Sequence, residues 1–185
     1  MSSRVEGIVA RLHGLHPRLI DLSLDRLVSL LKKLDHPELR LPPVIHVAGT
    51  NGKGSCCAFL RAIGEAANLR VHVFTSPHLV RFNERIRIAG ELVTDEALAD
   101  ALEHIERVNA AAAITVFEVI TAVALHLFAE NPAELCVLEV GLGGAGMPPT
   151  WWPARRRVPS PRSRSIIGNC SAIPSRRSRR RRRGS

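Results

Sequence analysis

The sequence has no tyrosine, and aromatic residues make up only 4% of its 185 residues. Cysteines are few: Cys56, Cys57, Cys136 and Cys170 show neither a CxxC spacing nor a histidine spacing suited to zinc. We therefore expect reduced packing cysteines in a cytoplasmic protein, without a disulfide framework or a thiolate metal cage. Because 45% of the residues are hydrophobic, the chain can build a core, which excludes disorder of the whole chain and collagen-like repeats.

A long hydrophobic run is also lacking. The N-terminus carries charges at Arg4, Glu6 and Arg11, which predicts an amphipathic helix rather than a secretory signal. Residues 110–129 are largely apolar, but Glu118 near their middle carries an insertion penalty of roughly 2.5–3.5 kcal/mol. We therefore expect a buried helix in this region and no membrane partner.

Acidic residues are missing from the end of the chain, where residues 151–185 contain twelve Arg and no Lys, Asp or Glu. The formal net charge of +9 accordingly becomes −3 over residues 1–150. A mildly acidic body with a basic tail argues against specific nucleic-acid binding by the whole chain. The tail has few apolar side chains to offset the entropy of ordering, so we expect it to be disordered.

Short β-branched runs alternate with helical patterns over the first 140 residues. Strands are predicted at residues 44–48, 71–75 and 135–140, and the last is a continuous apolar run typical of a strand covered on both faces. Helices are predicted at residues 19–34, 56–68, 94–105 and 115–130, with Thr94 as a cap. This alternation predicts an α/β fold with a P-loop-type parallel sheet flanked by helices. Periodicity ends at about residues 143–146, so the domain is expected to be incomplete and followed by the basic tail.

A glycine-rich loop follows the first predicted strand. It reads Gly49, Thr50, Asn51, Gly52, Lys53, Gly54, Ser55. Its glycines let backbone N–H groups converge on an anion, Lys53 can reach the β- and γ-phosphates, and Ser55 can ligate Mg²⁺. The loop departs from GxxxxGK[ST] at its first glycine and by Gly54 between the lysine and the hydroxyl. We predict ATP and Mg²⁺ as ligands, and the alternative is a glycine-rich turn that binds nothing.

A lone carboxylate, Glu139, lies near the end of the third predicted strand. Burying it is costly unless it meets a cation, and the carboxyl ends of strands in open α/β sheets are where ligands bind. Glu139 is therefore a candidate cation ligand, and a purely structural role is the alternative.

Three segments together resemble the folylpolyglutamate synthase/dihydrofolate synthase family, whose members are relatives of the Mur ligases. They are the phosphate-binding loop, residues 75–86 (TSPHLVRFNERI) and residues 137–144 (VLEVGLGG). The resemblance covers about residues 17–144 and implies a Mur-ligase-like central ATP-binding domain. It also implies an activity: ATP phosphorylates the terminal carboxylate of dihydropteroate or a folate, and the amine of L-glutamate then attacks the acyl phosphate.

The same resemblance implies roles for particular residues. It makes Lys53 catalytic and makes Ser55, Ser76 and Glu139 ligands of Mg²⁺. It assigns pteroate or folate binding to Asp21, Leu22, Ser23, Thr115, Val116, Phe117 and Glu118. The alternatives are that Ser76 only caps a turn and that residues 115–118 form an ordinary first helical turn. At residues 21–23, where Ser23 replaces the family's Gly, the alternative is that the family's pteroate-binding role does not apply. An intact member is expected to be a monomer with dihydropteroate or folate, L-glutamate and ATP as partners.

After Gly143 and Gly144 the family has Arg, one variable residue and Asp-Ala-Thr-Asn, which the chain lacks. Read one nucleotide upstream, however, the codons of residues 146–152 can spell Asp-Ala-Thr-Asn-Val-Val. The codons of residues 164–168 can spell Ser-Leu-Asp-His-Arg, and those of residues 177–185 can spell Ala-Ile-Ala-Ala-Glu-Lys-Ala-Gly-Ile. These resemble the family's metal segment and the segment carrying its functional lysine.

We interpret residues 145–185 as a frameshift product that follows a truncated N-terminal ATP-binding domain at residues 1–144. The chain as written is then expected to lack a third metal ligand, the functional lysine and the glutamate-binding domain, and hence the family activity. One alternative is a P-loop fragment whose Arg-rich tail binds RNA without specificity. Another is a Mur-type peptide ligase.

Overall fold

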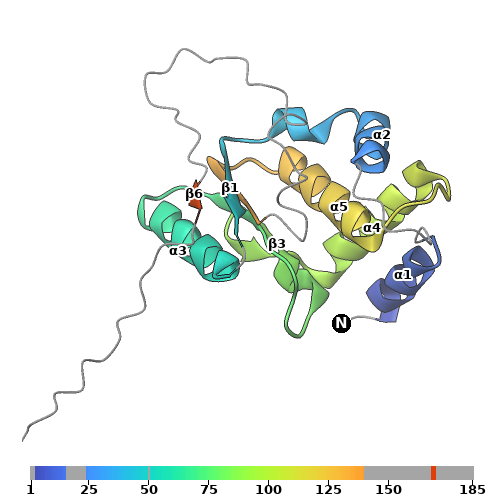
Figure 1. Cartoon of the computed structure of the whole chain (residues 1–185), viewed down its shortest axis with the longest axis horizontal. Helices are drawn as coiled ribbons and strands as arrows, with labels where there is room; N and C mark the ends of the chain where they lie inside the picture. The colour runs from blue at the N-terminus through green and yellow to red at the C-terminus, as the bar shows by residue number, and fades with distance from the viewer. Residues whose placement is uncertain (1–2, 16–23, 50, 140–167, 170–185) are drawn as a thin grey trace, which may run out of the picture.

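A computed structural model describes residues 3–15, 24–49, 51–139 and 168–169 of the chain. A six-stranded sheet lies between one helix, α3, and a layer in which α5 contacts the sheet and α1, α2 and α4 surround it (Figure 1). The helices are α1 Ser3–His13, α2 Asp25–Lys33, α3 Lys53–Ala66, α4 Asp95–Asn109 and α5 Val116–Glu130, with short 3-10 helices at Pro37–Arg40 and Phe82–Arg85. The strands are β1 Val44–Ala48, β2 Val71–Phe74, β3 Ile86–Ile88, β4 Glu91–Leu92, β5 Leu135–Glu139 and β6 Gly168–Asn169.

The strand order is β4-β3-β2-β5-β1-β6. The prediction of a parallel sheet is correct for β1, β2 and β5, and β6 also pairs with β1 in parallel. The sheet as a whole is mixed, because β3 and β4 form an antiparallel hairpin beside β2. The turn of this hairpin contains Ala89 and Gly90, both with positive φ (51° and 99°), as tight hairpin turns of this kind require.

Two apolar clusters lie on opposite faces of the sheet. On one face Cys136 and Leu138 of β5 belong to the large cluster that includes α4 and α5. On the other face Val137 packs with Cys57 of α3 and with neighbouring strand residues. This alternation explains why β5 reads as an unbroken apolar run, since both of its faces are covered.

The helix boundaries mostly agree with the sequence patterns. Thr94 accepts a hydrogen bond from the backbone N–H of Ala97 at 3.1 Å and so caps α4 as predicted. Thr115 caps α5 by accepting from the N–H of Glu118, also at 3.1 Å. The amphipathic helix predicted at the N-terminus is α1. The structure corrects three boundaries: α3 begins at Lys53 inside the glycine-rich loop rather than at residue 56, α4 runs on to Asn109 rather than ending at residue 105, and α2 begins at Asp25, after the non-helical Leu24.

Among the residues that the structure describes, no helix has the length and apolar character needed to cross a bilayer. The apolar region at residues 110–129 forms most of α5, which is buried against the sheet as expected. Except for Gly168 and Asn169, the predicted basic tail at residues 145–185 lies outside the described residues.

Candidate nucleotide and metal site

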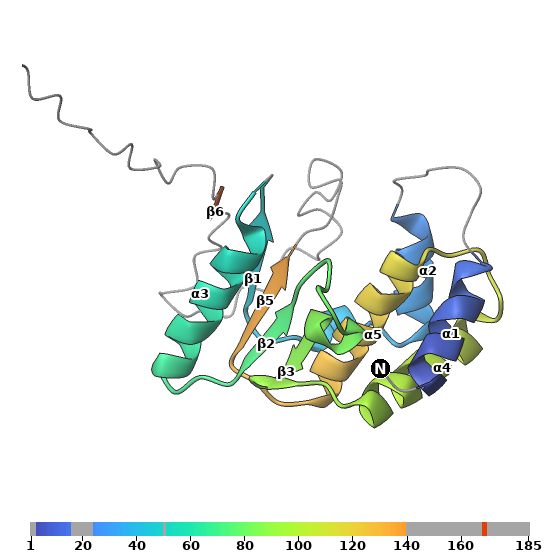
Figure 2. The same cartoon turned by 90° about the horizontal axis from the view of Figure 1, so that it is seen from below.

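The predicted site residues that the structure describes gather at one edge of the sheet. Because β1, β2 and β5 are parallel, their carboxyl ends meet there, and these ends lead into Gly49, Ser76 and Glu139. The helix α3 follows β1, and α5 precedes β5, so both helices begin at this same edge (Figure 2). The fold therefore brings the phosphate-binding loop, the proposed metal ligands and residues 115–118 to a common side.

The glycine-rich loop has the backbone conformation that its glycines predict. Gly49 has a φ of 151° and Gly52 a φ of 76°, values that other residues adopt only with strain. The first intrahelical hydrogen bond shown runs from the N–H of Cys56 to the carbonyl of Gly52 at 2.9 Å. The N–H groups of the first turn precede it at the positive end of the helix dipole, where such groups commonly bind anions. Thr50 lies outside the described residues.

Two predicted residues, Lys53 and Glu139, face each other across this edge. The Lys53 Nζ lies 4.0 Å from the Glu139 Oε1, and Glu139 is only 5% exposed. The other carboxylate oxygen accepts a hydrogen bond from the backbone N–H of Ser76 at 3.3 Å. Burial raises the pKa of Glu139, and the Ser76 N–H and the Lys53 charge oppose this rise without cancelling it. Such a carboxylate is poised to accept a further cation.

The donors at this edge suit Mg²⁺. A carboxylate and serine hydroxyls are oxygen ligands, and Mg²⁺ in nucleotide sites commonly adds phosphate oxygens and water to one or two protein carboxylates. No cluster of three or more His, Cys, Asp or Glu side chains occurs within residues 3–15, 24–49 and 51–139. The chemistry present therefore fits a metal shared between Glu139, the hydroxyls of Ser55 and Ser76, and a bound nucleotide, rather than an all-protein cage.

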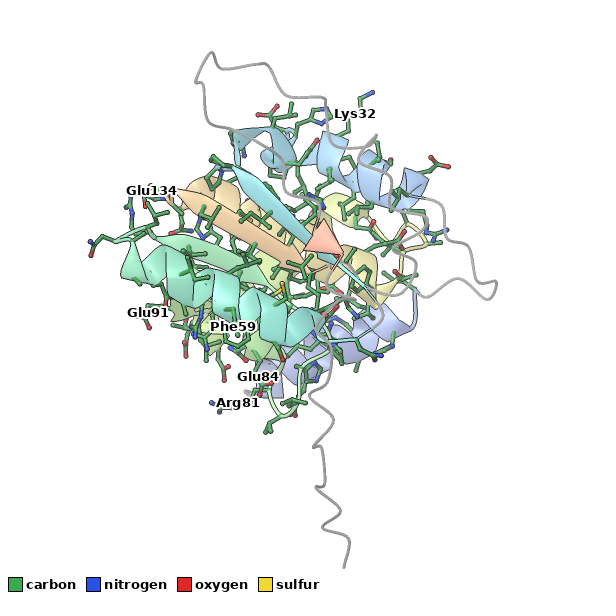
Figure 3. The ribbon with its side chains drawn as sticks, turned by 60° about the vertical axis from the view of Figure 1, so that its left-hand side comes forward. Lys32, Phe59, Arg81, Glu84, Glu91 and Glu134 are labelled. Carbon is green, nitrogen blue, oxygen red and sulfur yellow. The ribbon has the colours of Figure 1, made fainter. Side chains whose placement is uncertain are left out.

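Glu84 organises the loop that carries Ser76. Its carboxylate accepts hydrogen bonds from the N–H groups of Leu79, Val80 and Arg81 at 2.7, 3.1 and 2.8 Å. These donors lower the pKa of Glu84. Arg81 and Glu84 are labelled on this loop in Figure 3.

Arg85 also stabilises this loop, because its Nε donates a hydrogen bond to the Nδ1 of His78 at 2.9 Å. Part of the 75–86 motif is thus structural: its polar residues hold the backbone that presents Ser76 to Glu139.

The predicted pteroate segment at the start of α5 is built around Glu118, which is buried. Its Oε2 accepts hydrogen bonds from the N–H and the Oγ1 of Thr115, both at 2.8 Å. The Nε of Arg26 on α2 lies 3.2 Å from both of its carboxylate oxygens. Phe117 and Val116 are half-buried, with the Phe117 ring 6.3 Å from that of Phe74.

The other predicted pteroate residues, Asp21, Leu22 and Ser23, lie outside the described residues. They immediately precede α2, the helix that Arg26 ties to α5.

The roles of Arg26 and Glu84 could not be read from the sequence. Arg26 stands in the first turn of a helix, where no spacing shows which distant carboxylate it faces. Glu84 gives a weak signal, since an acidic residue three positions after Arg81 can accept a hydrogen bond from the backbone N–H of Arg81, as it does in the structure at 2.8 Å.

Central parallel strands with a lysine-bearing glycine loop at their carboxyl edge are typical of P-loop-type nucleotide-binding domains. No protein-family model matches the chain. The chain is 47% identical over 131 residues to the dihydrofolate synthase/folylpolyglutamate synthase of Haemophilus influenzae, a match that covers 70% of this chain and 29% of that protein. It is 41% identical over 143 residues to the Escherichia coli protein of the same name, covering 77% and 34%.

Solved structures of folate ligases are also similar to this chain. The E. coli FolC protein in complex with DHPP and ADP matches with a TM-score of 0.72 and 38% identity, over 77% of this chain and 34% of that one. A bifunctional folylpolyglutamate synthase/dihydrofolate synthase with Mn, AMPPNP and L-glutamate bound matches with a TM-score of 0.70 and 38% identity, again over 77% and 34%.

The resemblance to the folylpolyglutamate synthase/dihydrofolate synthase family is thereby confirmed. The chain spans about a third of the length of the relatives that it matches.

Proposed function

We propose that this chain carries the nucleotide-binding part of an ATP-dependent acid–amino-acid ligase of the folylpolyglutamate synthase/dihydrofolate synthase type. The observation that carries the proposal is the pairing of Lys53 with the buried Glu139 at the edge where the phosphate-binding loop begins α3. The similarity to folate ligases, among them structures with ADP or AMPPNP and Mn, supports the same conclusion.

In this proposal residues 49–55 bind ATP. The N–H groups in the first turn of α3 hold the phosphates, and the Lys53 ammonium neutralises the β- and γ-phosphate charge. Ser55, Ser76 and Glu139 hold Mg²⁺, which supplies charge neutralisation at the transferring phosphoryl group when it is bound. The loop set by Glu84 and Arg85 keeps Ser76 in place for this role.

The reaction would transfer the γ-phosphoryl group of ATP to the terminal carboxylate of dihydropteroate or tetrahydrofolate, which releases ADP. The amine of L-glutamate would then attack the acyl phosphate, forming the amide and releasing inorganic phosphate. Residues 21–23 and 115–118 would contact the pteroate part of the acceptor. Since the polar atoms of Thr115 and Glu118 already bond to each other and to Arg26, these two would position the segment while Phe117 and Val116 supply apolar contact.

The division into a ligase portion at residues 1–144 and an unrelated tail at residues 145–185 belongs to the same proposal. The chain as written would bind ATP and would not ligate glutamate. We also propose that the intact enzyme is a cytoplasmic monomer.

The test is incorporation of labelled L-glutamate with ATP and Mg²⁺, using the chain as written and the product of its gene with the reading frame restored. We expect the restored product to extend dihydropteroate or tetrahydrofolate and the chain as written to extend neither. Incorporation into a uridine-linked peptidoglycan precursor in place of the pterin acceptors would instead identify a Mur-type ligase and overturn the proposal.

A further inference from the structure

Arg85 is a half-buried cation that pairs with no carboxylate in the part of the chain that the structure describes. Its Nε donates to the Nδ1 of His78 at 2.9 Å, and its Cζ lies 5.2 Å from the centroid of the Phe82 ring. Burial lowers the pKa of Arg85, and no described carboxylate opposes this effect. A guanidinium that is partly removed from water without a counter-charge favours the binding of an anion.

The acidic neighbour of Arg85 does not supply that counter-charge. The carboxylate of Glu84 accepts hydrogen bonds from the backbone N–H groups of Leu79, Val80 and Arg81. Glu84 therefore fixes the backbone of the loop, and the charge of Arg85 stays available to a ligand.

His78 adds a second oriented donor beside the guanidinium. Because arginine has no acceptor, the Nδ1 of His78 must accept the bond from the Arg85 Nε, which places the proton of the neutral imidazole on Nε2. Among the described residues, neither this Nε2 nor the two Nη groups of Arg85 have a hydrogen-bond partner. The pair thus presents N–H donors of the kind that bind the two oxygens of a carboxylate.

This pair lies beside the predicted metal ligand Ser76. The carbonyl of Arg85 accepts a hydrogen bond from the N–H of Thr75 at 2.9 Å, and the next N–H, that of Ser76, donates to Glu139. His78 follows Ser76 by two residues. An anion held by Arg85 and His78 would therefore lie at the edge of the sheet where the nucleotide phosphates are proposed to bind.

The surroundings of the pair favour a ligand that has an aromatic ring next to its carboxylate. Leu79 and Val80 follow His78 and are 91% and 83% exposed, although Glu84 fixes their backbone. The Phe82 ring beneath Arg85 belongs to the same apolar cluster as Phe74. Immobile, exposed apolar side chains beside an anion-binding pair suit an aromatic acid better than a small polar amino acid.

We propose that Arg85 and His78 bind the carboxylate of the acceptor substrate, an aromatic acid, and that Leu79 and Val80 contact its ring. The positive charge of Arg85 reduces the repulsion between this carboxylate and the γ-phosphate of ATP, which must approach each other for phosphoryl transfer. The identity of the acceptor rests on the proposed function, whereas carboxylate binding rests on the geometry of this loop.

The test compares an acid with its amide. The full chain, with Mg²⁺ and ADP present, is titrated by calorimetry with dihydropteroate and with the same molecule whose terminal carboxylate is converted to a carboxamide. The wild-type chain should bind the acid about 10- to 100-fold more tightly than the amide, as expected for a charge-assisted pair. Arg85→Gln should bind the two equally, and Arg85→Lys, which keeps the charge without the planar fork, should keep part of the preference.

The ratio of the two affinities separates ligand contact from support of the loop, because a loosened loop weakens the binding of acid and amide alike. Arg81→Gln is the matched control, since it removes an exposed cation from the same loop (Figure 3) and should keep the wild-type ratio. His78→Phe should reduce the ratio without abolishing it.

Equal affinity of the wild-type chain for acid and amide, or a preference that survives Arg85→Gln, would overturn the proposal. So would an unchanged ratio in Arg85→Gln together with weaker binding of L-glutamate or ATP, which would assign Arg85 to one of those ligands. ATP affinity of the wild-type chain is measured in parallel. Its absence would refute the proposed function, whereas ATP binding without a preference for the acid would refute only this inference.

Discussion

At the scale of single residues, the buried carboxylate of Glu139 favours the binding of a cation. A carboxylate in an apolar strand is costly to bury, and the sequence therefore predicted a cation beside it. The structure places the Lys53 ammonium 4.0 Å away and the Ser76 N–H at 3.3 Å, yet burial still raises the pKa of Glu139. The existing partners thus do not fully compensate the carboxylate, which leaves a driving force for binding a metal.

The first prediction concerns Glu139→Gln. Burial raises the pKa of Glu139 above its ordinary value of 4.5, so the metal-free protein loses stability as the pH rises from 4.5 through this raised pKa. Mg²⁺, in contrast, binds only the ionised carboxylate of Glu139. Mg²⁺ should therefore strengthen ADP binding more as pH rises, by about tenfold or ~1.4 kcal/mol at neutral pH, and the variant should lose this effect. Titration calorimetry of ADP with and without Mg²⁺ measures this effect in the wild-type chain and in the variant.

Glu134→Gln is the matched control, because Glu134 precedes β5 at its opposite end and pairs with the exposed Arg70. This variant should keep the Mg²⁺ effect. If Glu139→Gln kept it as well, Glu139 would not be a metal ligand.

At the scale of elements, α3 packs closely against the sheet at Gly64, which has no side chain. A Cβ at this position would come within 2.8 Å of the Val71 Cγ2 and 3.4 Å of a Leu135 methyl group. Val71 is fully buried, so it has little room to move. This close contact lies near the C-terminal end of α3, against the first residues of β2 and β5.

Gly64→Ala should therefore destabilise the chain by about 1–3 kcal/mol, even though alanine favours a helix by about 1 kcal/mol over glycine. Urea unfolding followed by circular dichroism measures the change. Gly54→Ala is the control, since a Cβ there meets nothing within 4 Å and φ is not positive, so stability should hold or rise slightly. Equal effects of the two substitutions would refute the steric argument.

The ion pair between α2 and α5 is a second element-scale feature. Arg26 is 20% exposed at its side chain and Glu118 is 8% exposed, whereas the Arg4–Glu103 pair on α1 and α4 is 47% and 39% exposed. Arg26→Gln should cost about 1–3 kcal/mol, because it leaves a buried carboxylate short of its cation. Arg4→Gln should cost less, because water screens this exposed pair. A smaller loss for Arg26→Gln than for Arg4→Gln in urea unfolding would contradict this assignment.

The sequence predicted the elements whose patterns are strong. The β-branched runs predicted β1 and β2, the continuous apolar run predicted β5, and Thr94 and Thr115 marked the starts of α4 and α5. The β3–β4 hairpin was missed because its strands have three and two residues, too few for an alternating pattern to stand out. Lys53 was predicted from the phosphate-binding loop and Glu139 from a lone carboxylate in an apolar strand, whereas Ser76 was predicted only from the family resemblance; the structure brings these three residues together. Arg26 was not, since its partner is 92 residues away.

At the scale of the whole molecule, a mildly acidic N-terminal part is followed by a strongly basic C-terminal part. Residues 1–150 carry −3, and the twelve Arg of residues 151–185 make the total +9. Counterion release from nucleic acid depends on clustered cations and not on the fold that carries them.

Removing residues 151–185 should therefore abolish binding to single-stranded RNA and leave ATP affinity unchanged. For the full chain, the logarithm of RNA affinity should fall steeply with the logarithm of salt concentration, by about 0.7 per phosphate contact. Fluorescence anisotropy with a labelled oligonucleotide measures the RNA affinity of the full chain and of the shortened chain. RNA affinity that survives the deletion would place the binding surface on the body of the protein.

The central claim is that residues 49–55 and Glu139 form a nucleotide site, and ATP binding by the Lys53→Met variant tests it most directly. With Mg²⁺ present, the wild-type chain and the control Lys32→Met, whose lysine is exposed on α2, should bind ATP equally. Lys53→Met should bind about 10- to 100-fold more weakly, the loss expected for a charged hydrogen bond to phosphate. Equal affinity of all three proteins, or no binding by the wild-type chain, would contradict the account.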